Sequence, residues 1–200
     1  MIKDNFQVKT KNFIIRPYAL SDFKIWKESF QDIKRARNKW DLSAYIANDL
    51  SLTRFKKILK TQKTNRKNDT YYDFAVFDKK TKLIVGNVSI MDVSRGVFQN
   101  AYLGYGVLSP YWGQGYAKEF CLEALKIAFK TLNLHRLEAG INKSNLRSKR
   151  LARTIGMRRE GHSKRRLFLN GEWRDFDIYA ITAEEIGIKG VKGSLMVNRR

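Results

Sequence analysis

The 200-residue sequence contains one cysteine, two histidines and only 19 acidic residues, and each scarcity narrows the classes of protein it can be. The single cysteine, Cys121, excludes an internal disulfide, and one cysteine with two separated histidines supports no metal site. No apolar run reaches the length of a membrane span, and residues 1–10 lack the apolar segment of a secretory signal. We therefore expect a soluble, cytoplasmic protein that uses no metal and contacts no membrane.

Acidic residues are few beside the 40 lysines and arginines, so the formal net charge is +21. A net charge of this size gives information about binding partners rather than about the fold, and the phosphates of nucleic acids are the usual partners of a basic protein. Two clusters carry much of it: Lys143 to Arg166 has ten basic residues and one acid, and Arg54 to Lys67 has seven and none. These clusters predict docking on RNA, and ordinary solvated surfaces are the plain alternative.

The chain has enough apolar residues for a folded core, because 43% of it is hydrophobic and 12% is aromatic. At this length we expect a single domain, residues 1–185, with its core at about 13–182. Glycines among lysines follow, and they predict a basic, flexible tail at 186–200.

Patterns of apolar residues predict a series of short elements. Strands are expected at 13–16, 71–77, 83–91, 98–107, 134–141, 165–169 and 172–182. Helices are expected after a cap at Ser21, at 42–63, after residue 115 and at 145–155 with Leu146 facing inward, and 64–70 is expected to be a polar loop. These elements predict a mixed α/β domain in which helices cover both faces of a largely antiparallel sheet.

The stretch from Tyr102 to Phe129 carries the clearest pattern. Its first part alternates apolar residues, breaks at Ser109 and passes through Gly113 and Gly115. Apolar residues then recur with the three-and-four spacing of a helix that packs one side on a sheet: Ala117, Phe120, Cys121, Ala124, Leu125, Ala128 and Phe129. The stretch predicts a strand, a glycine turn and a helix, with Cys121 as a buried structural thiol.

The first turn of this helix is the candidate binding site. A helix N-terminus has unpaired N–H groups and a partial positive charge, and glycines let the main chain approach a ligand closely. An anion such as a phosphate is expected there. A P-loop is excluded because no Lys-Ser or Lys-Thr follows Gly115, and the dinucleotide pattern is excluded because Lys118 stands in place of its third glycine. A turn that merely needs small residues is the remaining alternative.

The residues Trp112-Gly113-Gln114-Gly115-Tyr116-Ala117 resemble the acyl-CoA pyrophosphate loop of the GNAT acetyltransferases, whose usual form is Gln/Arg-x-x-Gly-x-Gly/Ala. Trp112 departs from the first position, where the ribosomal-protein N-terminal acetyltransferase branch (RimJ/RimL-like) accepts an aromatic residue. Flanking motifs resemble the same branch: Tyr102-Leu103-Gly104-Tyr105, His135-Arg136, Asn145-Leu146-Arg147-Ser148, Gly156-Met157 and Asn170-Gly171-Glu172-Trp173-Arg174-Asp175. The resemblance covers about residues 14–182.

This resemblance implies acetyl-CoA as co-substrate and a GNAT fold with a mostly antiparallel, twisted sheet of about seven strands. It also implies a parallel, splayed contact between the strand before the loop and the strand at 134–141, where the pantetheine arm enters. The implied cofactor-binding residues are Val107, Leu108, Trp112, Gly113, Gln114, Gly115, Tyr116, Ala117, Asn145 and Ser148. A backbone N–H near Val107 or Leu108 is expected to polarise the thioester carbonyl.

Acetyl transfer requires the acceptor amine in its neutral form. An α-amino group with a pKa of about 7.7 to 8.0 is roughly 10 to 17% neutral at pH 7, whereas a lysine side chain is about 0.04% neutral. An N-terminal acceptor therefore needs little help from a base. The positions at which relatives carry a glutamate correspond to Tyr102, Gly140 and Leu167, so we expect proton removal through water, assisted by Glu138 or Glu172.

Two further roles follow from the resemblance. Ser148 matches the family serine that reaches the thioester sulfur, so we expect it to protonate the leaving thiolate. Asn145 resembles the asparagine that hydrogen-bonds pantetheine. Plain alternatives stay open, with Ser148 as an ordinary helical serine and Glu138 as a surface acid.

Three functions are compatible with this sequence. The first is an N-terminal acetyltransferase of a ribosomal protein that begins with Ala or Ser, held to ribosomal RNA by the two basic clusters. The second is acetylation of another amine of low pKa, such as that of aminoacyl-tRNA. The third is a ribosome-associated, RNA-binding assembly factor with weak catalysis, which the absent glutamates favour.

Overall fold

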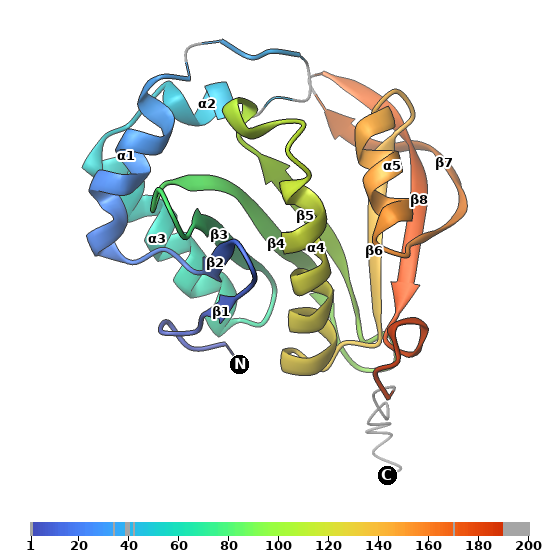
Figure 1. Cartoon of the computed structure of the whole chain (residues 1–200). Coiled ribbons are helices and arrows are strands. Elements are labelled where there is room, and N and C mark those ends of the chain that lie inside the picture. The colour runs from blue at the N-terminus through green and yellow to red at the C-terminus, as the bar shows by residue number, and fades with distance from the viewer. Residues whose placement is uncertain (1, 34, 39–40, 42, 170, 190–200) are drawn as a thin grey trace.

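The computed structural model describes residues 2–33, 35–38, 41, 43–169 and 171–189. In this part of the chain, one eight-stranded sheet has the order β1-β2-β3-β4-β5-β6-β8-β7 (Figure 1). Its strands are β1 (Val8–Lys9), β2 (Phe13–Arg16), β3 (Tyr72–Asp78), β4 (Ile84–Ser94), β5 (Asn100–Val107), β6 (Arg136–Asn142), β7 (Arg158–Leu169) and β8 (Glu172–Thr182). All neighbours are antiparallel except β5 and β6, which are parallel. The expected fold class is confirmed, with one strand more than the seven expected.

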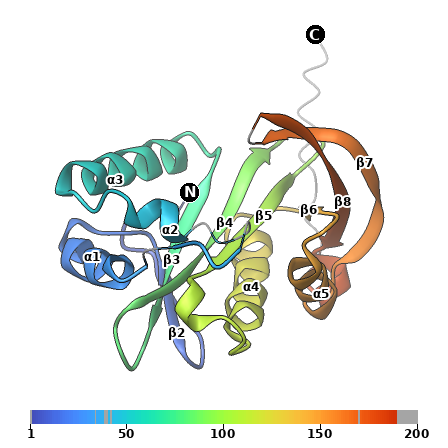
Figure 2. The same cartoon turned by 90° about the horizontal axis from the view of Figure 1, so that it is seen from above.

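Helices cover both faces of the sheet (Figure 2). Within the described residues they are α1 (Phe23–Gln31), α2 (Ser43–Ala47), α3 (Leu52–Lys67), α4 (Tyr116–Lys126), which continues into a π-helical stretch (Ile127–Thr131), and α5 (Leu146–Thr154). The alternation along β3 separates the faces: Phe74 points into the buried cluster with α4 and α5, and Ala75 and Phe77 into the cluster with α1 and α3.

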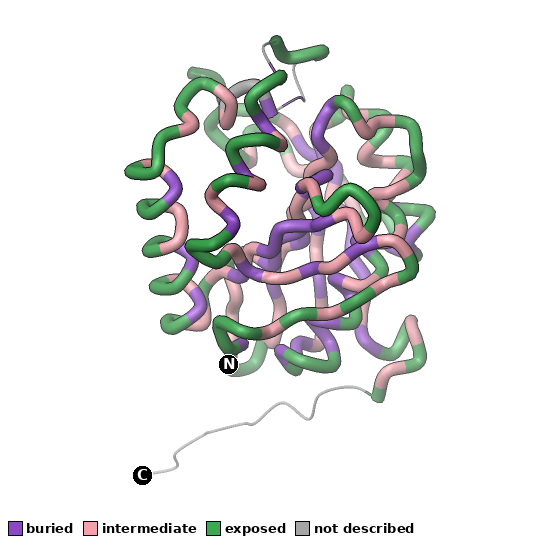
Figure 3. The backbone as a smooth tube through the Cα atoms, turned by 60° about the vertical axis from the view of Figure 1, so that its left-hand side comes forward, coloured by how far each residue is buried: buried purple, intermediate pink, exposed green. Residues whose placement is uncertain are grey.

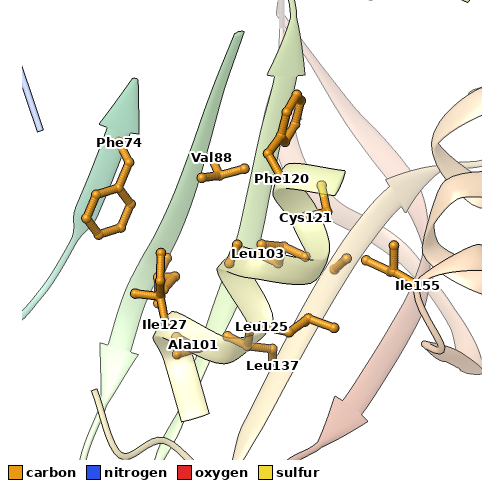
Figure 4. Close-up of a cluster of buried hydrophobic side chains, with 14 of the residues drawn as sticks. Phe74, Val88, Ala101, Leu103, Phe120, Cys121, Leu125, Ile127, Leu137 and Ile155 are labelled. Atoms are coloured by element: carbon orange, nitrogen blue, oxygen red, sulfur yellow. The ribbon is translucent and has the colours of Figure 1, made fainter. Parts of the chain in front are cut away.

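The apolar stripe of α4 is buried from Phe120 to Leu125, and Ala117 in the first turn is half-buried. Phe120, Cys121 and Leu125 belong to one buried cluster with Leu103 of β5 and Leu137 of β6 (Figure 4). Figure 3 shows the same pattern along the chain, with buried segments in the strands and exposed ones on the outer sides of the helices. Burial raises the pKa of the Cys121 thiol, which therefore stays protonated and has the properties of a structural residue.

The start of α1 differs from the expected cap at Ser21. A short 3-10 turn, Leu20–Asp22, precedes the helix, and the Asp22 carboxylate accepts a hydrogen bond from the Ala19 N–H at 2.7 Å. The same carboxylate binds the Arg16 guanidinium at 2.6 and 2.7 Å. Asp22 takes the position before the helix because a carboxylate can satisfy both the backbone and the arginine, which a serine hydroxyl cannot do.

The single helix expected at 42–63 is two helices, and residue 42 lies outside the described ranges. The second helix, α3, begins after Ser51, whose Oγ accepts a hydrogen bond from the Arg54 N–H at 3.1 Å. It continues to Lys67, through the first half of the expected loop at 64–70. The buried Arg66, which binds Asp4 at 2.6 Å, ties this last turn to the N-terminal segment.

Smaller differences concern two strand starts and one side chain. β7 begins at Arg158 rather than Arg165, and β5 begins at Asn100 rather than Phe98. Leu146, expected to face inward, is 71% exposed because it occupies the first position of α5.

A 3-10 turn, Glu184–Ile186, follows β8. Most of the expected tail, residues 190–200, lies outside the described residues. No helix in the described part of the chain is long and apolar enough to cross a membrane.

Candidate active site

The parallel strands β5 and β6 are paired over a short length and then separate. Their register ends where Tyr102 lies opposite Glu138. Beyond this point β5 continues to Val107 paired with β4 alone, and β6 continues to Asn142 paired with β8 alone. The diverging halves therefore present open backbone edges to each other, which is the splayed contact that the family resemblance implied.

The N–H groups of β5 alternate between β4 and this open edge. The Leu108 N–H donates to the Val85 carbonyl oxygen at 2.9 Å, on the β4 side. In an antiparallel ladder the preceding N–H points the other way, so the N–H groups of Val107 and Tyr105 face the open edge. Of the two expected carbonyl donors, Val107 lies on the open side, and the Leu108 N–H is occupied.

The glycine turn presents free backbone at the start of α4. Gly113 and Gly115 have φ values of +84° and +75°, a left-handed conformation that glycine adopts without strain. A Cβ atom at either position would meet no other heavy atom within 4 Å. The turn therefore leaves space in front of the first N–H groups of α4, at Tyr116 and Ala117, and Gln114 is exposed beside them. This arrangement fits a diphosphate.

Trp112 joins the glycine turn to the neighbouring elements. Its Nε1–H donates to the Val107 carbonyl oxygen at 2.7 Å, on β5. The Arg147 guanidinium of α5 lies over its ring, 5.2 Å from the centroid. Trp112 therefore holds the loop in place between β5 and α5. A Gln or Arg side chain, which is usual at this position in the GNAT motif, would make different contacts.

A pair of hydroxyl groups connects α5 to β5. Ser148 Oγ lies 2.6 Å from the Tyr105 hydroxyl oxygen, and the Tyr105 hydroxyl donates to the Ser148 carbonyl oxygen at 3.2 Å. Burial raises the pKa of Tyr105, which therefore keeps its proton. Asn145 caps α5, with its Oδ1 accepting from the Ser148 N–H at 3.2 Å. The sequence reasoning missed Tyr105 because the contact joins residues 43 positions apart.

The two candidate glutamates lie in different places. Glu138 is opposite Tyr102 where the strands part, and its carboxylate accepts from Arg136 Nε at 3.0 Å. Glu172 stands at the first position of β8, and its side chain is 65% exposed and pairs with Arg174 at 2.9 Å. Glu138 therefore borders the opening, and Glu172 belongs to the surface of the β7–β8 hairpin.

Arg166, which the sequence placed only in a basic cluster, reaches the same opening. It donates to the Tyr102 hydroxyl, and its guanidinium carbon lies 5.4 Å from the centre of that ring. A Cβ atom at Gly140 would lie 4.0 Å from Arg166 Nε. Among the described residues, no group of three or more His, Cys, Asp or Glu side chains is arranged to hold a metal ion.

Comparison with known families identifies this architecture. A family model described as "Acetyltransferase (GNAT) domain" matches residues 12–158. The chain belongs to the GNAT acetyltransferase family. Members of the GNAT family use acetyl-CoA, so the open space before α4 and the open edge of β5 are the features of this GNAT domain that suit a coenzyme A chain.

Relatives of this GNAT protein include enzymes that act on ribosomal proteins. The chain is 32% identical over 126 residues to the probable N-acetyltransferase YjcK of Bacillus subtilis (strain 168), covering 63% of this chain and 69% of that protein. It is 32% identical over 119 residues to the ribosomal protein uS5-alanine N-acetyltransferase of Escherichia coli (strain K12), covering 60% of this chain and 61% of that enzyme. The match thus spans about three fifths of the E. coli enzyme.

A solved structure extends the likeness to nearly the whole chain. Mycobacterium smegmatis RimJ in complex with CoA-disulfide aligns with a TM-score of 0.75 at 25% identity, covering 90% of this chain and 88% of that one. The resemblance to the RimJ/RimL-like branch is therefore confirmed.

Proposed function

We propose that the protein transfers an acetyl group from acetyl-CoA to the N-terminal α-amine of a protein, with a ribosomal protein that begins with Ala or Ser as substrate. The observation that supports this best is the arrangement along β5. The Val107 N–H faces the open edge, Trp112 ties the glycine turn to the same residue, and the Tyr105–Ser148 pair closes the other side. A diphosphate site on α4, a carbonyl donor on β5 and a proton donor on α5 thus lie around the open end of β5.

Each group has a separate task in this reaction. When bound, acetyl-CoA supplies a thioester whose carbonyl carbon accepts the amine. The N–H groups of Tyr116 and Ala117 hold the diphosphate, and the Val107 N–H stabilises negative charge on the carbonyl oxygen. The Ser148 hydroxyl, backed by the protonated Tyr105, delivers a proton to the departing sulfur.

An α-amine is the acceptor best matched to this site, because it is neutral far more often than a lysine at pH 7. The E. coli relative is named for the N-terminal alanine of ribosomal protein uS5. The net charge of +21 favours partners that are rich in phosphate, and ribosomal RNA surrounds ribosomal proteins.

We propose that ribosomal RNA is held by the two basic clusters. The lysines of α3 are exposed: Lys56, Lys57, Lys60, Lys63 and Lys67. The second cluster, Lys143 to Arg166, extends over α5 and β7, where Arg150 and Arg153 are exposed and Lys149 is bound to Asp177. Both clusters therefore offer exposed basic side chains to phosphates.

The experiment is acetyl-CoA turnover on peptides that begin with Ala or Ser, with the same peptides blocked at the N-terminus but carrying a lysine as control. We expect acetylation of the free α-amine only, read by mass spectrometry. Turnover that persists on the blocked peptides would refute N-terminal specificity. If the protein acetylates purified aminoacyl-tRNA in preference to every peptide, aminoacyl-tRNA replaces a protein N-terminus as the proposed acceptor.

An experiment in cells can identify the protein substrate. Mass spectrometry of ribosomal-protein N-termini, with and without this gene, should show one terminus that loses its acetyl group in the deletion strain.

A further inference from the structure

The face of the sheet opposite α4 has a polar row across β3, β4 and β5. Asp73 of β3 lies opposite Ser89 of β4, and Ser89 lies opposite Gly104 of β5. A Cβ atom at Gly104 would lie 3.0 Å from the Met91 sulfur, so glycine lets the Met91 side chain pack closely on β5. Gly104 comes two residues after Tyr102, where β5 leaves β6. The row therefore ends next to the splayed strands.

Asp73 is held by three neutral donors. Its Oδ1 accepts from the Ser89 hydroxyl at 2.6 Å and from the Asn87 side-chain amide at 3.3 Å. Its Oδ2 accepts from the Gln62 side-chain amide of α3 at 2.9 Å. Ser89 and Gln62 are buried, so the direction of the carboxylate is fixed from two sides.

The side chains that hold Asp73 are neutral, whereas arginines hold Asp69 and Glu138. Asp69 pairs with Arg95 at 2.6 Å, and Glu138 pairs with Arg136 at 3.0 Å. The donors to Asp73 are the uncharged side chains of Gln62, Asn87 and Ser89. Its negative charge is therefore oriented by neutral groups and is available to a cation that comes from outside.

Asp73 also faces a groove large enough for a peptide end. It lines, with Tyr71, the sheet side of a groove of about 790 Å³, and α3 lines the other side. Neighbouring strands are about 5 Å apart, so the carboxylate that reaches Ser89 lies about one strand away from Gly104 on β5. A chain that enters along this groove can bring its terminal amine to Asp73.

We propose that Asp73 receives the ammonium group of the acceptor and removes its proton, a role that rests on the proposed acetyl transfer. The ammonium nitrogen gives one proton to the carboxylate, and the neutral amine forms a bond to the acetyl carbonyl carbon. The bond from that carbon to sulfur then breaks, and the nitrogen loses its second proton. One proton is delivered to the sulfur, and the other passes from Asp73 to water.

Other titratable groups near Asp73 do not offer the same chemistry. Those that face it from the surrounding elements are Tyr71 of β3, Tyr18 after β2, Asp49 before α3, and Arg54 and Lys57 of α3. Burial raises the pKa of both tyrosines, so they stay protonated at neutral pH. Asp49 lines the α3 side of the groove, away from β5.

The test compares the wild-type protein with Asp73→Asn, which removes the charge at constant size, and with Asp92→Asn, which changes an exposed carboxyl of β4. The acceptors are a peptide beginning with Ala, one beginning with Ser, and alanyl-tRNA, and kcat/KM is measured from about pH 6 to 9.5. We expect Asp73→Asn to lower kcat/KM by about 6- to 10-fold at pH 7, because only about 10 to 17% of an α-amine is neutral in solution at that pH. The deficit should shrink above about pH 8, because the variant uses acceptors already deprotonated in solution.

Two further measurements separate this role from a structural one. The affinity for acetyl-CoA, measured by calorimetry, should be the same in Asp73→Asn, Asp92→Asn and wild type. Ser89→Ala removes a donor that orients the carboxylate, so it should lower kcat/KM in the same direction as Asp73→Asn and leave the affinity for acetyl-CoA unchanged.

The outcomes distinguish the two proposals. If Asp73→Asn keeps kcat/KM within about threefold of wild type with an unchanged pH profile, Asp73 has no such role and acetyl transfer stands. If the wild type binds no acetyl-CoA, or acetylates none of the three acceptors, the proposed function and the role of Asp73 fail together.

Discussion

Single side chains determine the chemistry on the α5 side of the site. If Ser148, supported by Tyr105, protonates the leaving sulfur, Ser148→Ala and Tyr105→Phe should each lower kcat by about 10- to 100-fold and leave the affinity for acetyl-CoA nearly unchanged. Because the two hydroxyl oxygens lie 2.6 Å apart, the double variant should lose little more than the stronger single one. Thr154→Ala, which removes an exposed hydroxyl of α5, is the matched control. If the loss of kcat in the double variant equals the product of the two single losses, the two hydroxyl groups are not coupled.

A second side chain, Asp177, contributes to the folding stability of the protein. Lys149, Arg159 and His162 hold the pKa of Asp177 well below its usual range. A carboxyl group with a lowered pKa in the folded state stabilises the fold above its unfolded pKa of about 3.9, and this contribution is lost as the pH falls further. Asp177→Asn should therefore destabilise the protein at pH 7 by about 3 kcal/mol, since it leaves Lys149 without its partner.

Chemical denaturation at several pH values measures this effect. The difference between Asp177→Asn and wild type should be constant from about pH 5 to 7 and shrink below about pH 4. Asp175→Asn, two residues earlier and more exposed, should change stability much less. An Asp177→Asn protein as stable as wild type at pH 7 would show that the ion pairs contribute nothing net.

At the scale of elements, the turn between β5 and α4 is the part that a substitution should affect most selectively. Gly115→Asp places a carboxylate where the diphosphate is expected, so it should weaken acetyl-CoA binding at least about 100-fold. Gly171→Asp is the matched control, because Gly171 has a similar φ of +81° but lies in the β7–β8 turn. Equal acetyl-CoA affinity in both variants would exclude the turn as the diphosphate site.

The elements also show what the sequence could predict. The turn at Gly113 and Gly115 was predicted because its signal is local, with strand alternation, glycines and helical period in one stretch. The start of α1 was misplaced because Asp22 is recruited by Arg16, six residues away, which no helical pattern records. The break before α3 was missed because apolar spacing continues through Ser51, whose hydroxyl begins a new helix.

Contacts between elements were the harder part of the site. The Tyr105–Ser148 pair needs the packing of α5 against β5, and the row of Asp73, Ser89 and Gly104 needs the order and register of three strands. Neither the helix packing nor the strand register can be inferred from composition or from local motifs. The family resemblance supplied the splayed strands, and the structure added the side chains that surround them.

For the whole molecule, the charge of +21 should govern association with RNA. If α3 contacts phosphates, Lys56→Glu with Lys60→Glu should weaken binding to a single-stranded RNA oligonucleotide and lower the slope of log K against log salt by about 1.4. Turnover of a free peptide should not change. Lys24→Glu with Lys27→Glu on α1 alters the net charge equally outside both clusters, and an equal effect of this pair would mean that only net charge matters.

The measurement on which all of these roles depend is the binding of acetyl-CoA to the wild-type chain, followed by isothermal titration calorimetry on folded protein. One molecule should bind per chain with a dissociation constant in the micromolar range, about 1 to 100 μM. Desulfo-CoA, which keeps the diphosphate and lacks the thiol, should also bind. No heat with either compound, from protein whose circular dichroism shows the folded state, would contradict the assignment of the β5–α4 turn as the coenzyme site.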